Sequence, residues 1–110
     1  MTEIQAQDLL NTITHSIESC KKCRLKKWRL HPVPGFGSHT ASIVFVGEAP
    51  GYNEDRQGLP FVGRAGELLE NLLRNSGFNR SAVWIGNVIK CRPPENRDPM
   101  VDEIRACSPY

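Results

Sequence analysis

Four cysteines form two separated pairs with the chemistry to bind a metal centre. Two residues lie between Cys20 and Cys23, and fifteen lie between Cys91 and Cys107. Sixty-seven residues separate the two pairs, so folding has to bring them together. Four thiolates around one centre suit either a structural zinc or a four-iron cluster, and the spacing alone does not choose between them. Disulfides are the third option, which a cytosolic setting disfavours.

Basic residues follow the first cysteine pair. Arg24, Lys26, Lys27 and Arg29 surround Trp28. Such a run is either a solvated face or a set of cations that lowers thiolate pKa values and offsets the charge of a cluster. The formal net charge of the chain is only +2, which is too small to indicate a nucleic-acid partner by itself.

A second candidate site is the segment from residue 47 to residue 63, which holds four glycines, two prolines and three carboxylates. It follows the apolar run 42–46 and precedes a helical pattern that starts at Arg64. In an open α/β sheet, ligands bind just past the carboxyl ends of strands, and glycines let backbone N–H groups approach them. We therefore expect a ligand-binding loop, the alternative being an ordinary long connection.

Asn87 is a polar side chain close to the end of an otherwise apolar strand. A buried asparagine has to be hydrogen-bonded. Its amide therefore either pins a neighbouring backbone segment or reads a ligand.

Hydrophobic periodicity predicts the elements that position these residues. Two apolar strands are joined by a crossover helix with leucines on one face and a stop at Gly77, and the strand 42–46 is expected to be buried on both faces as in a parallel sheet. A first helix and a short last helix flank them, and loops cover 31–41 and 90–99. The predicted elements are helix 4–18, strand 42–46, helix 64–75, strand 82–89 and helix 100–106.

Composition indicates a single globular domain over residues 1–110, with 39% apolar and 24% charged residues. No apolar run approaches the roughly eighteen residues of a membrane span, and no secretory signal pattern opens the chain. A cytoplasmic, nucleoid-associated protein without a membrane partner is the default expectation.

The motifs 47–63 and 87–99, with Glu103 and the stretch 107–110 beyond them, resemble those of the family 4 (iron–sulfur) uracil-DNA glycosylases. The resemblance implies a three-layer α/β/α fold with a parallel sheet, of which this chain is the N-terminal half. It implies a base-excision repair enzyme that hydrolyses the N-glycosidic bond of a flipped-out deoxyuridine and leaves an abasic site.

The same resemblance implies roles for three pocket side chains. Asn87 contacts uracil: its NH₂ donates to O4 and its carbonyl accepts from N3–H, a pattern that cytosine reverses. Phe61 stacks on the flipped ring. Glu54 lies near uracil C5 and obstructs the methyl group of thymine, with a surface charge as the alternative for Glu54 and for Asp55.

Further implied roles fall on the start of the loop. Backbone N–H groups of residues 47–51, with Gly47, Ala49 and Gly51 as substrate-binding positions, face uracil O2 and stabilise the leaving anion. Ala49 stands where another branch of the superfamily has a catalytic aspartate. Glu48 then positions the attacking water.

The resemblance also implies that Cys20, Cys23, Cys91 and Cys107 hold a [4Fe–4S] cluster, with structural zinc as the alternative. The cluster staples the N-terminal segment to the segment after the second strand, which stabilises a small core.

One departure from the family pattern is the absence of its second motif, His-Pro-Ser, from these 110 residues. We therefore expect either a fragment or a reduced relative, inactive alone, whose exposed sheet edge needs a missing C-terminal half or a second chain. The expected partners are uracil-containing DNA and replication or repair proteins. A non-catalytic iron–sulfur module for DNA or replication proteins is the alternative function. The glycine spacing of 58–65 resembles a P-loop, but Arg64 and Ala65 replace the required Lys and Ser/Thr.

Overall fold

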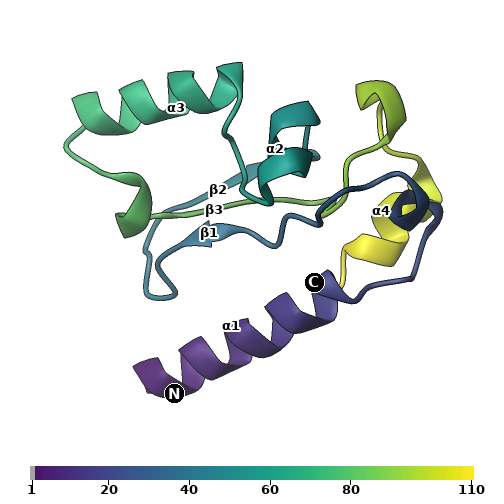
Figure 1. Cartoon of the computed structure of the whole chain (residues 1–110). Coiled ribbons are helices and arrows are strands. Elements are labelled where there is room, and N and C mark those ends of the chain that lie inside the picture. Colours follow the sequence, from purple (N-terminus) through teal and green to yellow (C-terminus); the bar gives the residue numbers. More distant parts are fainter. Residues whose placement is uncertain (1) are drawn as a thin grey trace.

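The computed structural model describes residues 2–110 and has a small sheet between helices (Figure 1). Strands β2 (Val44–Gly47) and β3 (Trp84–Asn87) are parallel, in a register that sets Gly47 opposite Asn87. The predicted parallel pair is thereby confirmed. A short strand β1 (Phe36–Gly37), which the sequence did not predict, adds an antiparallel partner to β3 and gives the order β1-β3-β2.

Helices lie on both sides of this sheet, as the α/β prediction requires (Figure 1). Helix α3 (Arg64–Asn75) connects β2 to β3 on one side, and helix α1 (Glu3–Glu18) lies on the other. Thr2 and Gln5 form a capping box that begins α1. Gly77, with φ +83°, follows α3 as predicted. The sheet is mixed rather than purely parallel, because β1 runs against β3.

The segment predicted as one long loop contains a helix, α2 (Tyr52–Gln57). The Glu54 carboxylate accepts the Gly51 N–H at its start, and Gly58 ends it at φ +72°. This helix has six residues, an acidic first turn and a glycine at each end. It was not predicted because the glycine and proline content of the segment indicated a loop.

Strand β2 is not buried on both faces, so that prediction was wrong. Val44 is 55% exposed and Val46 is 66% exposed. The physical reason is position: β2 forms one edge of the sheet, and neither helix layer covers those two side chains.

The remaining elements are short, and two of them lie at the cysteine segments. Helix α4 forms close to its predicted place, with Cys107 as its last residue. The 3₁₀ turn η3 lies in the predicted loop 90–99, and η2 overlaps the first residue of the predicted strand 82–89. These elements are η1 (Arg24–Lys27), η2 (Arg80–Ala82), η3 (Pro94–Asn96) and α4 (Val101–Cys107).

Two small hydrophobic cores hold the fold together. The first, between α3 and the sheet, contains the buried residues Leu73, Val83 and Ile85, with Phe61 packed against it. The second surrounds the cysteines and contains Leu25, Ile89, Cys91 and Cys107, with Cys23, Ala49 and Tyr110 packed against it. Within residues 2–110, no helix combines the length and the apolar character needed to cross a membrane.

Candidate functional site

A cavity of about 130 Å³ lies where β2 and β3 end. Its walls come from the loop after β2, from the start of α3 and from the last residue of β3. The lining residues are Ala49, Glu54, Phe61, Ala65 and Asn87. All four predicted substrate-binding residues other than glycine therefore border one space, at the place where parallel sheets bind ligands.

The Asn87 amide borders this cavity and is not used by the fold. Asn87 is only 4% exposed, yet among the described residues its side chain has no hydrogen-bond partner, and only its backbone carbonyl is engaged, by Lys90 Nζ at 2.6 Å. No fully buried side-chain nitrogen or oxygen in residues 2–110 lacks a partner. The amide atoms must therefore reach the cavity, where they are available to a ligand.

Phe61 and Asn87 converge on the same glycine. A β-carbon on Gly47 would come within 2.6 Å of Phe61 Cζ and would also collide with Asn87 Oδ1. Only glycine allows the ring, the amide and the strand end to approach so closely. Phe61 itself adopts a left-handed backbone at φ +51°, which is costly for an aromatic residue and typical of a functional position.

The Glu54 carboxylate holds the loop that surrounds the cavity. It accepts the N–H groups of Gly51, Val62 and Gly63, each at 2.9 Å. Burial acts to raise the pKa of the Glu54 carboxyl, but these backbone hydrogen bonds outweigh it and lower the pKa below its ordinary value. Glu54 therefore faces the cavity as an anion.

Two implied roles at the start of the loop fit less well. The Gly51 N–H is bonded to Glu54, and Pro50 has no N–H, so neither can face a ligand oxygen. Gly47 pairs with Asn87 in the ladder between β2 and β3, so its N–H belongs to the sheet. Within residues 47–51, the N–H groups of Glu48 and Ala49 remain as candidates. Glu48 is exposed and does not line the cavity.

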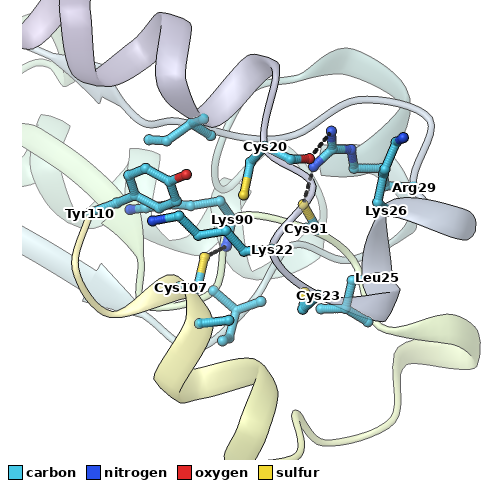
Figure 2. Close-up of a pocket in the computed structure, with 13 residues that line it drawn as sticks. Cys20, Lys22, Cys23, Leu25, Lys26, Arg29, Lys90, Cys91, Cys107 and Tyr110 are labelled. Atoms are coloured by element: carbon cyan, nitrogen blue, oxygen red, sulfur yellow. Dashed lines mark hydrogen bonds between the residues drawn. The ribbon is translucent and has the colours of Figure 1, made fainter.

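The four cysteines line one separate pocket, as Figure 2 shows, although they come from segments far apart in the sequence. Cys20 and Cys23 lie between α1 and η1, Cys91 follows β3, and Cys107 ends α4. The Tyr110 ring completes one wall, and Lys22 Nζ lies over it, 4.4 Å from the ring centroid. The fold thus brings the two predicted pairs together.

One cationic side chain and one backbone N–H contact the cysteines directly. Arg29 donates to Cys91 Sγ at 3.0 Å and to the Cys20 carbonyl at 2.9 Å, and the Lys90 N–H donates to Cys107 Sγ at 3.2 Å. Burial nonetheless raises the pKa of the Cys91 and Cys107 thiols against the lowering effect of Arg29 and Lys90. Among the described residues, Arg29 is the member of the basic run that bonds to a thiol sulfur. The predicted charge compensation therefore depends on this side chain rather than on the whole run.

The sulfurs surround a space rather than a point. Within residues 2–110, no group of three or more His, Cys, Asp or Glu side chains is gathered closely enough for a single metal ion. A zinc ion needs all its sulfurs about 2.3 Å from one centre. In a four-iron cluster each thiolate binds a different corner, so wider sulfur spacing is compatible with that group.

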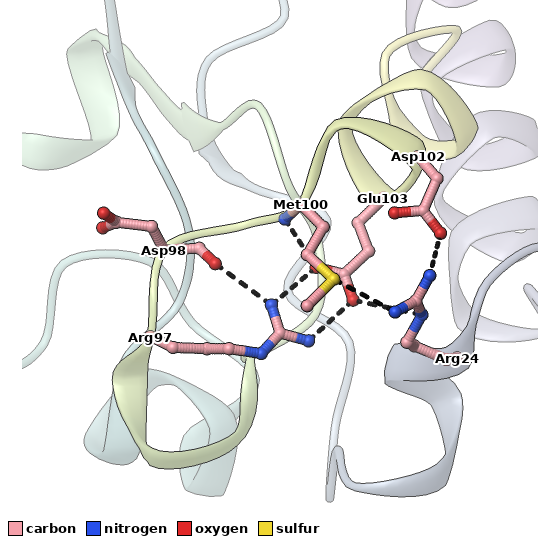
Figure 3. Close-up of polar contacts among 6 residues, drawn as sticks. All are labelled: Arg24, Arg97, Asp98, Met100, Asp102 and Glu103. Carbon is pink, nitrogen blue, oxygen red and sulfur yellow. Dashed lines mark hydrogen bonds and ion pairs between the residues drawn. The ribbon is translucent and has the colours of Figure 1, made fainter.

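A buried carboxylate ties the two cysteine segments together (Figure 3). Glu103, with its side chain wholly buried, receives both Nη atoms of Arg97 at 2.8 Å and the Met100 N–H at 2.8 Å. Arg24 of η1 reaches Glu103 at 3.7 Å and also pairs with Asp102. Hydrogen bonding from Arg97 lowers the pKa of the Glu103 carboxyl. The sequence offered Glu103 only as a motif match, because no local pattern reported that its side chain would be buried and paired with Arg97.

Asp55 is a second buried acid, so its alternative as a surface charge was wrong. It is 3% exposed and accepts the Leu30 N–H at 2.9 Å and the His31 N–H at 3.4 Å. The His31 ring, to which the sequence assigned no role, bonds the Asp55 carbonyl at 3.0 Å. These contacts fasten α2 to the segment that follows η1.

The fold and the cavity at the strand ends agree with a known class of proteins. The family model described as "Uracil DNA glycosylase superfamily" matches residues 34–110, and the chain belongs to that superfamily. The matched range contains all three strands and all five cavity-lining residues.

Within the superfamily, the chain is similar to type-4 uracil-DNA glycosylases. It is 56% identical to that of Sulfurisphaera tokodaii over 94% of this chain and 47% of the relative, and 52% identical to that of Archaeoglobus fulgidus over 92% and 51%. A type-5 uracil-DNA glycosylase of Thermus thermophilus is 32% identical over 84% and 56%. The chain spans about half the length of these curated relatives.

Proposed function

We propose that this chain supplies one side of the pocket of a uracil-DNA glycosylase. In this pocket an extruded uracil is bound and its N-glycosidic bond is hydrolysed. The observation that carries the proposal is the unpartnered Asn87 amide at a cavity shared with the Phe61 ring. An apolar cavity of about 150 Å³ accommodates benzene, so a space of about 130 Å³ is of the right order for one six-membered ring. The uracil-DNA glycosylase names of the relatives favour uracil as that ring.

Specificity in this proposal comes from Asn87 and Glu54. The Asn87 NH₂ donates to uracil O4 while its carbonyl accepts from N3–H. Cytosine reverses both patterns and leaves buried polar groups unpaired, at a cost of about 1–3 kcal/mol each. The ionised Glu54 carboxylate, fixed by three backbone donors, occupies space beside the ring where the methyl group of thymine would lie.

Catalysis in this proposal depends on leaving-group stabilisation. Bond cleavage leaves a uracil anion and an oxocarbenium-like sugar, so donors that face developing charge contribute most. The N–H groups of Glu48 and Ala49 follow the end of β2, and Ala49 lines the cavity. Glu48, being exposed, is accessible to the water that attacks the sugar.

We also propose that Cys20, Cys23, Cys91 and Cys107 hold a [4Fe–4S] cluster in a cytoplasmic protein. Support comes from the shared pocket and from the donors on Cys91 and Cys107. When bound, such a cluster would supply structural cross-linking. Arg29 and the Lys90 N–H would offset its charge.

The test is the release of uracil from a single uracil-containing oligonucleotide by the purified full natural protein, followed as cleavage at the abasic site. Matched oligonucleotides carry cytosine or thymine. Asn87→Ala and Phe61→Ala should each lower kcat/KM by about 10-fold to 100-fold, since one buried amide pair or one base stack is worth about 1–3 kcal/mol.

Two controls lie outside the cavity. Asn71→Ala changes an exposed residue of α3, and Phe78→Ala changes an aromatic residue that is 44% exposed. Both should leave uracil release unchanged. DNA binding without uracil release would favour a non-catalytic binding module, and release that neither cavity substitution affects would contradict the pocket.

A further inference from the structure

Arg80 contacts the backbone that carries the Phe61 ring. It lies in η2, and its side chain is 20% exposed. Its guanidinium donates to the Pro60 carbonyl at 2.9 Å, to the Phe61 carbonyl at 2.6 Å and to the Gly66 carbonyl at 3.2 Å. It thereby joins the end of the central loop to the first turn of α3.

The fourth contact orients this side chain. Arg80 Nε donates to Glu70 Oε2 at 2.9 Å, so a carboxylate on α3 holds the guanidinium while both Nη atoms face the loop. A planar guanidinium presents its donors in a fixed fork. Lysine at this position could reach one or two of these acceptors but could not match all four.

The bonded carbonyls belong to a strained stretch. Phe61 has φ +51°, and such a conformation persists only where its surroundings over-determine it. The Phe61 carbonyl also lies very close to α3, since a β-carbon on Gly66 would overlap it. Arg80 and the missing side chain of Gly66 therefore act on the same peptide group.

We propose that Arg80 is a positioning residue that sets the angle at which the Phe61 ring enters the cavity. The proposal rests on the proposed function, in which that ring stacks on the base. Arg80 contacts neither the base nor the cavity, whose lining does not include it. Its effect on uracil release must therefore pass through Phe61.

The test is a double-mutant cycle between Arg80 and Phe61 in the purified full natural protein. Arg80→Met and Arg80→Lys are made alone and in a Phe61→Ala background, and kcat/KM for uracil release and the unfolding midpoint are measured for each. Arg74→Met is the control, because Arg74 also pairs with Glu70, at 3.9 Å, but is 73% exposed and bonds no loop carbonyl.

Alone, Arg80→Met should lower kcat/KM by about 10-fold, the order of one lost base stack, and Arg80→Lys should lower it less. In the Phe61→Ala background both losses should vanish, while the drop in unfolding midpoint remains. A loss of the same size in both backgrounds, or a loss equal to that of Arg74→Met, would overturn the proposal. If Arg80→Met does not fold, Arg80→Lys decides by the same comparison.

The two proposals fail in different ways. If the unsubstituted protein releases no uracil, the proposed function fails. If it does release uracil and the cycle shows no coupling, only the role of Arg80 fails.

Discussion

Asn87 Oδ1 lies against the α-carbon side of Gly47 so closely that a β-carbon on Gly47 would overlap it. The two residues are register partners at the ends of β3 and β2. The parallel pairing thus places a free amide directly over a glycine, and the Phe61 ring fills the other side of the same gap. The geometry of the cavity therefore depends on the absence of a side chain at Gly47.

Gly47→Ala should therefore abolish the cavity while sparing the fold. The added methyl group would displace the Asn87 amide and the Phe61 ring, so we expect uracil release to fall at least about 10-fold, as when one base contact is lost. The matched control is Gly86→Ala on β3, whose β-carbon would lie 3.4 Å from the nearest atom, an ordinary contact. Equal activity of the two variants would show that the gap at Gly47 is not used.

Glu54 should make the stability of the loop depend on pH. Its folded-state pKa lies below the ordinary value of 4.5, so its contribution is fully present above that value and is lost as the pH falls through the lowered pKa. Glu54→Gln should lower the free energy of unfolding by about 1–3 kcal/mol near neutral pH.

The measurement for Glu54 is the unfolding free energy of both proteins across the acid range. The difference between them should be constant above about pH 5.5 and shrink below pH 4.5. Glu67→Gln, an exposed residue of α3, is the control. A difference that grows as the pH falls would have the wrong sign for a depressed pKa.

Glu103 should matter far more for stability than its neighbour Asp102. The Glu103 side chain is 0% exposed and paired with Arg97, whereas that of Asp102 is 57% exposed. Breaking a buried pair costs about 3–5 kcal/mol, but an exposed one contributes about 0–1 kcal/mol. Chemical denaturation of Glu103→Gln and Asp102→Asn measures this contrast, and equal losses would mean that the buried Glu103–Arg97 pair contributes no more to stability than an exposed pair.

The cysteine pocket should contain iron. Protein purified without oxygen should be brown, absorb broadly near the blue end of the visible spectrum and carry about four irons per chain. Cys91→Ser should remove that absorbance and lower the unfolding midpoint, and Ser108→Ala, beside Cys107, should do neither. A colourless protein loaded with one zinc would contradict the cluster and favour the alternative.

Local pattern predicted the elements that have strong periodicity. The leucine stripe and Gly77 predicted α3, and the apolar runs predicted β2 and β3. Helix α2 was missed because Gly51 and Gly58 read as loop, although Glu54 three residues after Gly51 is a helix-start signal. The two-residue β1 is too short to give a period.

Some of the site residues were likewise predicted from the sequence and others were missed. Phe61 and Glu54 were found through a resemblance, and Asn87 also through its place at the end of an apolar strand. The structure brings the three to one cavity, while their roles stay predictions. Arg80 and Asp55 were not found, because their partners are 19 and 25 residues away in sequence and no local spacing reports such contacts.

The most direct test of the central claim is a titration of the protein with free uracil, followed through the side-chain amide resonances of Asn87 and the ring resonances of Phe61. We predict that both shift together and saturate with uracil, that cytosine at the same concentrations shifts neither, and that the backbone resonance of Asn71 on α3 stays fixed. Binding of uracil that leaves the Asn87 amide unshifted would contradict the account.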